Sequence, residues 1–224
     1  MSNFTTWRSL VDGEEILVIP DSAVAHYVAD DYDEENGVWP DRINNYDLTG
    51  SGPTLTQDGI GGEPAVEFQN SGDVLVNTDL YLQQPATYLV VLEIDSVGND
   101  FCFIFTSSDD DTRHVHWFDD SNDAFRYRGD SNSVTGEGPA DDTTLTSTVF
   151  DGSDSLLRQD RDQTTSGDPG SSDQNGFRVG ADDEGGQVLT GRIAEIRVYD
   201  VNLDQTGDLE SEEDSLWGRY VEGN

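Results

Sequence analysis

The chain has 224 residues and no lysine: its 11 basic side chains are all arginine, against 47 Asp and Glu residues, for a formal charge of −36. This charge opposes binding to nucleic acid, which needs clusters of Lys and Arg, and it disfavours an anionic membrane for the same reason. It also repels itself in a compact chain at ordinary ionic strength, whereas roughly molar salt shortens the screening length to about 3 Å. The composition therefore predicts a protein adapted to concentrated salt, with its acidic residues on a solvated surface.

Aromatic and apolar runs argue against the alternative of an acidic disordered chain. The sequence contains 4 Trp, 8 Tyr and 9 Phe, and the runs Tyr88–Leu92 and Phe101–Phe105 are apolar enough to need a core. The length fits one large all-β domain. We expect residues 24–224 to form that domain and residues 1–23 to be an N-terminal extension or a first strand.

Short segments of strand-like composition alternate with turns rich in Gly, Asn, Asp and Ser, which is typical of an all-β fold. Phe101–Phe105 is apolar on both faces, which predicts a strand covered on both sides, with Cys102 as a small buried side chain. In Ile193–Tyr199, apolar and polar residues alternate, which predicts a strand with one apolar face and one face toward polar surroundings.

Near the C-terminus, helical spacing replaces the strand pattern after residues 204–206. The apolar residues that recur at this spacing are Leu209, Leu216, Trp217 and Tyr220. The whole pattern predicts an all-β fold: a two-sheet antiparallel jelly-roll sandwich with a short C-terminal helix.

The order of several segments resembles the laminin-G-like jelly rolls of the concanavalin A-like lectin and glucanase superfamily. The segments that carry the resemblance are Trp39–Asp41, Gly62–Phe68, Pro85–Tyr88, Val149–Gly152 and Gly191–Asp200. The last reads G-R-I-A-E-I-R-V-Y-D, similar to the closing strand of that family, and it is followed by Leu203 and a short helix. The match spans roughly residues 24 to 220 and implies the fold rather than a function, because these motifs mostly describe packing and turns.

The superfamily that this resemblance names contains glycoside hydrolases, lectins and adhesion modules. Its laminarinase-like members carry a Glu-x-Asp-x-x-Glu strand, and the nearest candidate here is Glu93-Ile-Asp95. Ser96, Val97 and Gly98 follow, so the second Glu is missing, and a retaining glycosidase needs two carboxyl groups flanking the scissile bond. We therefore expect no enzymatic activity, with a glycoside hydrolase as the weaker alternative.

The acid excess stops between Arg113 and Arg128, a segment with three Arg and three Asp in a chain of charge −36. Its pattern predicts a hairpin of 113–118 and 124–128, with Val115 and Trp117 on one face and two histidines on the other. Arginine and aromatic side chains are enriched at interfaces, so we expect a ligand or subunit interface here. The candidate residues are Arg113, His114, His116, Trp117, Arg126, Tyr127 and Arg128. The alternative is a strand pair whose arginines only neutralise neighbouring acids.

Metal ligands stay unknown from the sequence. His114 and His116 have the spacing of two ligands on one strand face, but a third zinc ligand is missing. Calcium is common in laminin-G-like folds, and Asp151 and Asp154 are candidates, but the acidic background gives no basis for placing a site. We expect that no cofactor is required.

Two hypotheses of function follow. The first is a non-enzymatic structural or adhesion subunit on the virion of a halophile virus, as a capsid decoration, turret or fibre protein. It is motivated by a compact domain that starts at Met1 with no signal peptide and no membrane segment. We expect this subunit to form a homo-oligomer and to contact other virion proteins and host surface glycans or glycoproteins. The alternative is a cell-surface or secreted carbohydrate-binding module of a halophile.

Overall fold

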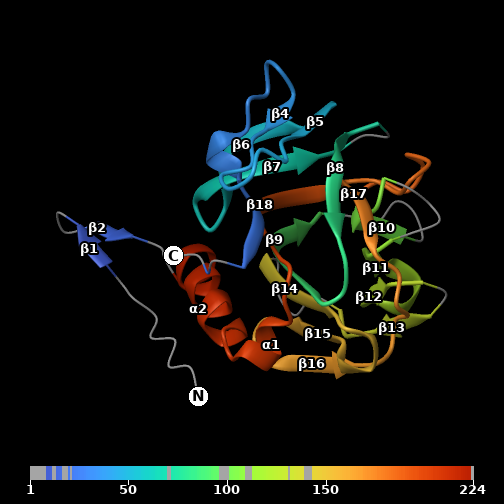
Figure 1. The fold of residues 1–224 in the computed structure, drawn as a ribbon. Coiled ribbons are helices and arrows are strands. Elements are labelled where there is room, and N and C mark those ends of the chain that lie inside the picture. The colour runs from blue at the N-terminus through green and yellow to red at the C-terminus, as the bar shows by residue number, and fades with distance from the viewer. Residues whose placement is uncertain are drawn as a thin grey trace.

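Two antiparallel sheets lie face to face in a β sandwich (Figure 1). The computed structural model describes residues 9–11, 14–16, 20, 22–69, 72–95, 101–108, 113–130, 132–138 and 143–222. The predicted fold class, a two-sheet antiparallel sandwich with a short C-terminal helix, is confirmed. We call the two layers the front sheet and the back sheet.

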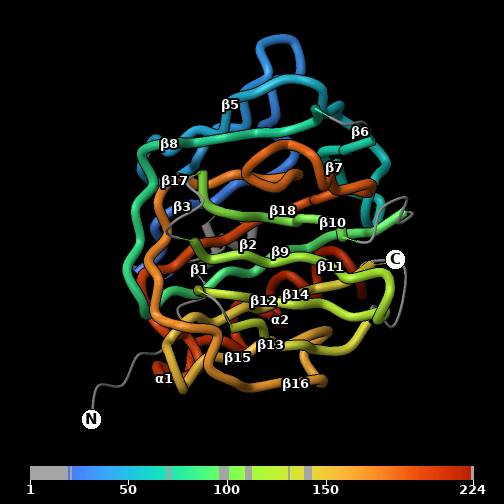
Figure 2. Tube along the Cα trace, turned by 90° about the vertical axis from the view of Figure 1, so that its right-hand side faces the viewer, coloured from blue at the N-terminus to red at the C-terminus, as the bar shows by residue number. Residues whose placement is uncertain are grey.

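The front sheet has eight strands, which Figure 2 presents toward the viewer. In spatial order they are β13 (Ser133–Thr135), β12 (Ala124–Arg128), β11 (Val115–Asp119), β10 (Phe101–Thr106), β17 (Gln174–Val179), β8 (Val74–Leu82), β5 (Leu48–Ser51) and β4 (Val38–Trp39). The predicted hairpin is β11 and β12, joined by the short 3₁₀ helix η2 (Asp120–Asn122).

The back sheet is built around β18. In spatial order its strands are β16 (Gln163–Ser166), β15 (Leu156–Gln159), β14 (Thr143–Phe150), β9 (Ala86–Ile94), β18 (Gly191–Tyr199), β7 (Glu63–Phe68) and β6 (Thr54–Ile60), with β3 (Ala23–Val28) also paired to β18. The other elements are β1 (Ser9–Val11), β2 (Glu14–Ile16), η1 (Ala29–Asp31), η3 (Gly152–Asp154), α1 (Leu203–Thr206) and α2 (Leu209–Tyr220).

Aromatic side chains from both sheets fill the space between them. Tyr88 of β9 stacks on Phe105 of β10, with ring centroids 4.6 Å apart, and Phe177 of β17 lies against both rings. All three are fully buried. Such pairs add to the free energy gained by burying apolar area, so this cluster ties the front sheet to the back sheet.

Helix α2 covers the outer face of the back sheet and forms a second core there. Leu209, Leu216 and Tyr220 of the helix pack with Leu89 and Val91 of β9. The helix predicted from this spacing is confirmed, and it is not long and apolar enough to cross a membrane, nor is any other helix in the described part of the chain.

A β-bulge in β18 changes the predicted alternation of that strand. The register shifts between Ile193 and Glu195, so Ile193 joins the core between the sheets and Ala194 the core beneath α2. Strict alternation predicts Ile193 on the face of Glu195 and Ala194 on the face of Ile196. The bulge exchanges these two faces, so the prediction is wrong for Ile193 and Ala194. Glu195 and Arg197 point toward α2 and are almost completely buried.

The sequence predicts that both faces of β10 are covered. In the structure, its outer face is covered only in part. Cys102 and Ile104 are buried between the sheets, and Cys102 is a free thiol. Phe101 and Phe103 point to the outer face of the front sheet and are half-buried. This outer face therefore presents aromatic side chains at the surface.

Candidate functional site

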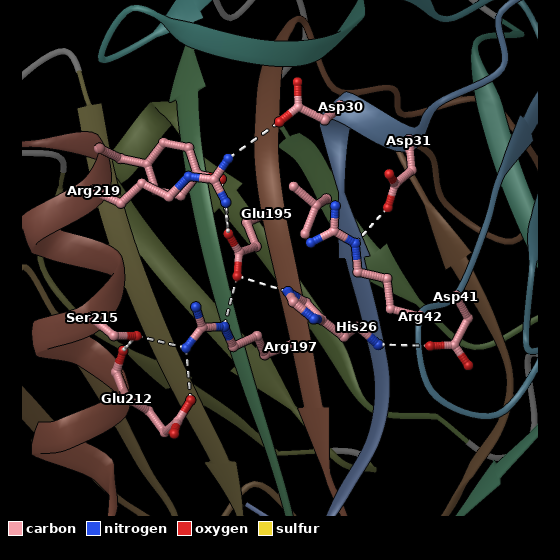
Figure 3. Close-up of polar contacts among 12 residues, drawn as sticks. His26, Asp30, Asp31, Asp41, Arg42, Glu195, Arg197, Glu212, Ser215 and Arg219 are labelled. Atoms are coloured by element: carbon pink, nitrogen blue, oxygen red, sulfur yellow. Dashed lines mark hydrogen bonds and ion pairs between the residues drawn. The ribbon is translucent and has the colours of Figure 1, made fainter. Parts of the chain in front are cut away.

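A cluster of charged side chains lies beneath α2, on the back sheet (Figure 3). Arg197 of β18 donates from Nε to Glu195 at 2.7 Å and from Nη1 to Glu212 of α2 at 2.7 Å. His26 of β3 donates from Nε2 to Glu195 at 2.8 Å. Arg219 of α2 reaches the other oxygen of Glu195 at 3.3 Å. The carboxylate of Glu195 thus joins residues of β3, β18 and α2.

Hydroxyl groups complete the same cluster. Tyr220 donates to Glu195 at 2.8 Å, and Tyr199 donates to Glu212 at 2.6 Å. Burial would raise the pKa of Glu195, but Arg197 and the hydrogen bonds from His26 and Tyr220 outweigh it and lower the pKa to about 2. The carboxylate is therefore ionised at neutral pH and fully engaged with protein groups. We interpret the cluster as a clamp that holds α2 on the back sheet, not as a ligand site.

The Glu-x-Asp pair of the sequence lies at one end of the back sheet. Glu93 accepts a hydrogen bond from Thr143 at 2.7 Å and lies 3.6 Å from Arg192. Asp95 accepts from Arg192 at 2.9 Å. Both carboxylates are therefore bound to one arginine of the neighbouring strand β18.

The two histidines of the predicted ligand face point into the sandwich and are fully buried. His114 donates from Nε2 to the carbonyl of Ser172 at 2.9 Å, so its Nδ1 accepts from the hydroxyl of Tyr88 at 2.8 Å. His116 donates from Nδ1 to the carbonyl of Arg126 at 3.1 Å. Tyr127 is also buried among the core aromatics. These three side chains lie in the core rather than at the surface.

Burial makes the two histidines sensitive to acid. Desolvation lowers the pKa of His114 and His116 to about 3, well below the value near 6.5 of an unfolded chain. The unfolded state therefore binds more protons below pH 6.5, and the free energy of unfolding falls as pH decreases from 6.5 toward 3. We expect a slope that approaches about 1.4 kcal/mol per pH unit for each histidine.

Urea unfolding at constant ionic strength between pH 7 and 5 measures this slope. The variant His116→Phe keeps an aromatic ring beside Phe105 and Phe125. Its free energy of unfolding should change less steeply with pH, by the contribution of one histidine. Comparing the two proteins isolates His116 from the other titrating groups. Parallel curves for the variant and the parent protein would refute the assignment.

The opposite face of the same hairpin forms a pocket on the outside of the front sheet. Trp117 of β11 is paired with Phe103 of β10, and their rings stack with centroids 6.0 Å apart. The guanidinium of Arg128 of β12 lies 5.8 Å from the centre of the Trp117 ring, within the range of a cation–π contact. The pocket has a volume of about 330 Å³. Its lining residues are Phe101, Phe103, Arg113, Trp117, Arg128, Asp182, Asp183, Glu184 and Gln187.

Charges of both signs surround the aromatic floor of this pocket. Arg113 lies 3.3 Å from Asp183, an ion pair that joins the start of the hairpin to the loop after β17. Beside the pocket, Arg126 lies 2.9 Å from Asp119 on the neighbouring strand. The structure thus brings together four of the seven predicted residues on one face: Arg113, Trp117, Arg126 and Arg128.

The loop of residues 182–187 is the part of the pocket that the sequence did not predict. An isolated bridge between Ala181 and Val188 closes it, and Asp182 accepts from the amide of Gly186 at 2.6 Å. It reaches the hairpin because β17 pairs with β10 in the front sheet. No local pattern in residues 182–187 indicates this long-range pairing.

The two candidate calcium ligands, Asp151 and Asp154, accept hydrogen bonds that anchor helix α1. Asp151 accepts from the side-chain amide of Asn202 at 2.9 Å, and Asp154 accepts from Gln205 at 3.2 Å. In the part of the chain that the structure describes, no group of three or more His, Cys, Asp or Glu side chains is placed to hold a metal ion.

A second pocket, of about 440 Å³, lies between the β15–β16 turn and α2. Its aromatic residue is Trp217, with the guanidinium of Arg161 at 5.6 Å from the ring centre. Arg161 pairs with Asp214, and Arg158 lies 3.4 Å from Glu213. Its aromatic part is therefore a single ring, without the pair of stacked rings found in the front-sheet pocket.

Comparison with solved structures identifies the architecture. The chain superposes on a sialidase of Trypanosoma rangeli in complex with sialic acid with a TM-score of 0.64 and 12% identity, over 88% of this chain and 34% of the sialidase. It also superposes on domain 4 of AbnA, an extracellular GH43 arabinanase of Geobacillus stearothermophilus, in complex with arabinotriose. That match has a TM-score of 0.59 and 19% identity, over 84% of this chain and 98% of that domain.

The fold is that of these β-sandwich domains. It is consistent with a concanavalin A-like jelly roll, as the sequence resemblance implies. The chain spans about a third of the sialidase that it matches, 34%, but nearly all of the arabinanase domain, 98%. No protein-family model matches the chain, and no curated protein matches it. At these identities the comparison establishes the fold alone.

Proposed function

We propose that the protein is a carbohydrate-binding module whose binding site is the front-sheet pocket. The observation that carries this proposal is the aromatic floor of Phe103 and Trp117 in a pocket lined by charged groups of both signs. A sugar ring has apolar C–H faces that pack on aromatic rings, and hydroxyl groups that both donate and accept. The pocket supplies guanidinium donors and carboxylate acceptors around such a floor.

The size and position of the pocket support the same proposal. Its volume of about 330 Å³ is at the lower end of small-ligand pockets, which suits a few sugar units rather than a protein domain. It lies on the outer face of the front sheet, whereas α2 covers the corresponding face of the back sheet. One structural neighbour, the arabinanase domain of similar size, was solved with arabinotriose.

Binding without hydrolysis is the second part of the proposal. Retaining glycosidases need two carboxyl groups about 5 Å apart across the scissile bond. The candidate pair Glu93 and Asp95 belongs to the back sheet and is bound to Arg192. In the pocket, Asp183 is paired with Arg113, and the acidic residues come from one loop on one side of the site.

A saccharide microarray in about 3 M KCl tests the proposal. The parent protein should bind a subset of immobilised saccharides, and Trp117→Ala should lose that binding, whereas Trp117→Phe should keep part of it. Trp217→Ala is a matched control, because Trp217 also lies beneath a guanidinium but belongs to the other pocket, where it is half-buried, whereas Trp117 is buried. Equal array signals for Trp117→Ala and the parent protein would exclude this pocket as the site.

The setting that we propose for the module is the surface of a virus particle that infects a halophile, with a halophile cell surface as the alternative. Adhesion to glycans requires no catalytic centre in either setting. Mass spectrometry of purified particles and of cell envelopes distinguishes the two locations, since the protein should be enriched in only one of them.

A further inference from the structure

Arg178 of β17 is exceptional among the arginines of this acidic chain. Of the ten arginines that the structure describes, eight form ion pairs with Asp or Glu, and Arg128 lies over the ring of Trp117. Arg178 forms no ion pair or hydrogen bond with any residue in the described ranges, and its side chain is partly exposed. Its Nε is buried without a hydrogen bond, as are the Nε atoms of Arg126, Arg128 and Arg192. This isolation occurs in a chain with 47 carboxylates.

The side chain of Arg178 belongs to the same face as the pocket. Phe177 and Val179 on either side of it point into the core between the sheets, so alternation directs Arg178 to the outer face. It is paired with Thr106 of β10, the strand that also carries Phe103. Strand β17 is the second neighbour of β11, so Arg178 lies about 10 Å across the sheet from the strand of Trp117.

The buried Nε of Arg178 is out of reach of a ligand, but the side chain is partly exposed, so a ligand reaches it through its exposed atoms. A guanidinium presents paired N–H groups whose geometry matches a carboxylate. At molar salt the screening length is about 3 Å, so only a direct contact of this kind contributes to affinity. The missing partner of Arg178 is therefore best supplied by an anionic group of a bound ligand.

The pocket itself does not favour an acidic group. Asp182 and Glu184 would repel a carboxylate there, and Arg113 is already paired with Asp183. Arg178 is not among the residues that line the pocket. A ligand that uses both features must extend from the aromatic floor across the front sheet toward β17, with its neutral part in the pocket and its charge beyond it.

We propose that the ligand of the front-sheet pocket is an acidic saccharide whose carboxylate binds the guanidinium of Arg178. This inference rests on the proposed carbohydrate-binding function and names the substrate class. The neutral sugar units pack on Phe103 and Trp117, and a uronic-acid-type unit about two strands away pairs with Arg178.

The test uses saccharides in matched pairs: uronic-acid oligosaccharides immobilised beside their carboxyl-reduced counterparts, with sulfated and neutral oligosaccharides as further members. The parent protein should prefer the acidic member of a pair by about tenfold to a hundredfold, the effect of one charged hydrogen bond. Arg178→Gln should abolish the preference and leave binding to the reduced member unchanged. Arg42→Gln, which removes an arginine paired with Asp31, should keep the preference.

The possible outcomes separate this inference from the proposed function. Equal binding of acidic and reduced members, unaffected by Arg178→Gln, would overturn the acidic-ligand inference and leave the carbohydrate-binding function intact. Preference for sulfated over carboxylated members would overturn the carboxylate class. Absence of binding to every saccharide, with cooperative unfolding of the protein confirmed in the same buffer, would overturn both.

Discussion

Replacing Arg197 by Met should lower the free energy of unfolding by about 3 to 5 kcal/mol, the usual effect of removing one partner from a buried ion pair. The variant retains Glu195 and Glu212 in a buried site without the cation that bridges them at 2.7 Å on each side. The contact between β18 and Ser215 of α2, also 2.7 Å, is lost as well. We therefore expect α2 to become the least stable element of the fold.

Urea unfolding in about 3 M KCl measures this effect, and hydrogen exchange of the α2 amides locates it. The matched control is Arg42→Met, which breaks a pair with Asp31 in which both side chains are partly exposed. That change should cost about 0 to 1 kcal/mol. If Arg197→Met were as mild as the control, the cluster beneath α2 would not be the clamp described above.

Cooperative folding should be lost below about 1 M salt. The charge of −36 is spread over 47 acidic residues, and the 11 arginines can pair with only a minority of them. Unpaired carboxylates repel one another across the surface unless the screening length becomes shorter than their separation, which requires roughly molar salt. Dilution to 0.1 M KCl should therefore unfold the protein, as followed by tryptophan fluorescence and circular dichroism.

A non-ionic osmolyte separates screening from solvent exclusion in this experiment. Sucrose is excluded from protein surfaces and favours burial, but it does not screen charge. When added to the protein in 0.1 M KCl, sucrose should restore folding less effectively than additional KCl of the same osmolality. A protein with the same urea midpoint at 0.1 M and 3 M KCl would show that the acidic surface is not an adaptation to salt.

Much of the fold could be predicted because periodicity reflects burial directly. The alternation in the hairpin correctly separated Val115 and Trp117 from His114 and His116, since successive side chains of a strand point to opposite faces. The alternation does not indicate which of the two faces points into the core, because Trp and His are both amphipathic. The bulge in β18 was also unpredictable, since it adds one residue without changing the composition.

The residues of the front-sheet face and of the clamp beneath α2 differ in how well they could be predicted from the sequence. Trp117 and Arg128 were candidates because the acid excess stops in their segment. Residues 182–187 and Arg178 were missed, because they reach this face only through the pairing of β17 with β10. The clamp was missed because charged residues were expected on the surface, although Glu195 and Arg197 flank Ile196 in a strand followed by a helix that could cover them.

Calorimetric titration of the best array saccharide in about 3 M KCl tests the central claim, that the front-sheet pocket is a carbohydrate site. The parent protein and Trp217→Ala should bind with the same Kd, and Trp117→Ala should bind at least about 30-fold more weakly, which corresponds to about 2 kcal/mol for a central aromatic contact. A Kd for Trp117→Ala equal to that of the parent protein, with the fold intact, would contradict the account.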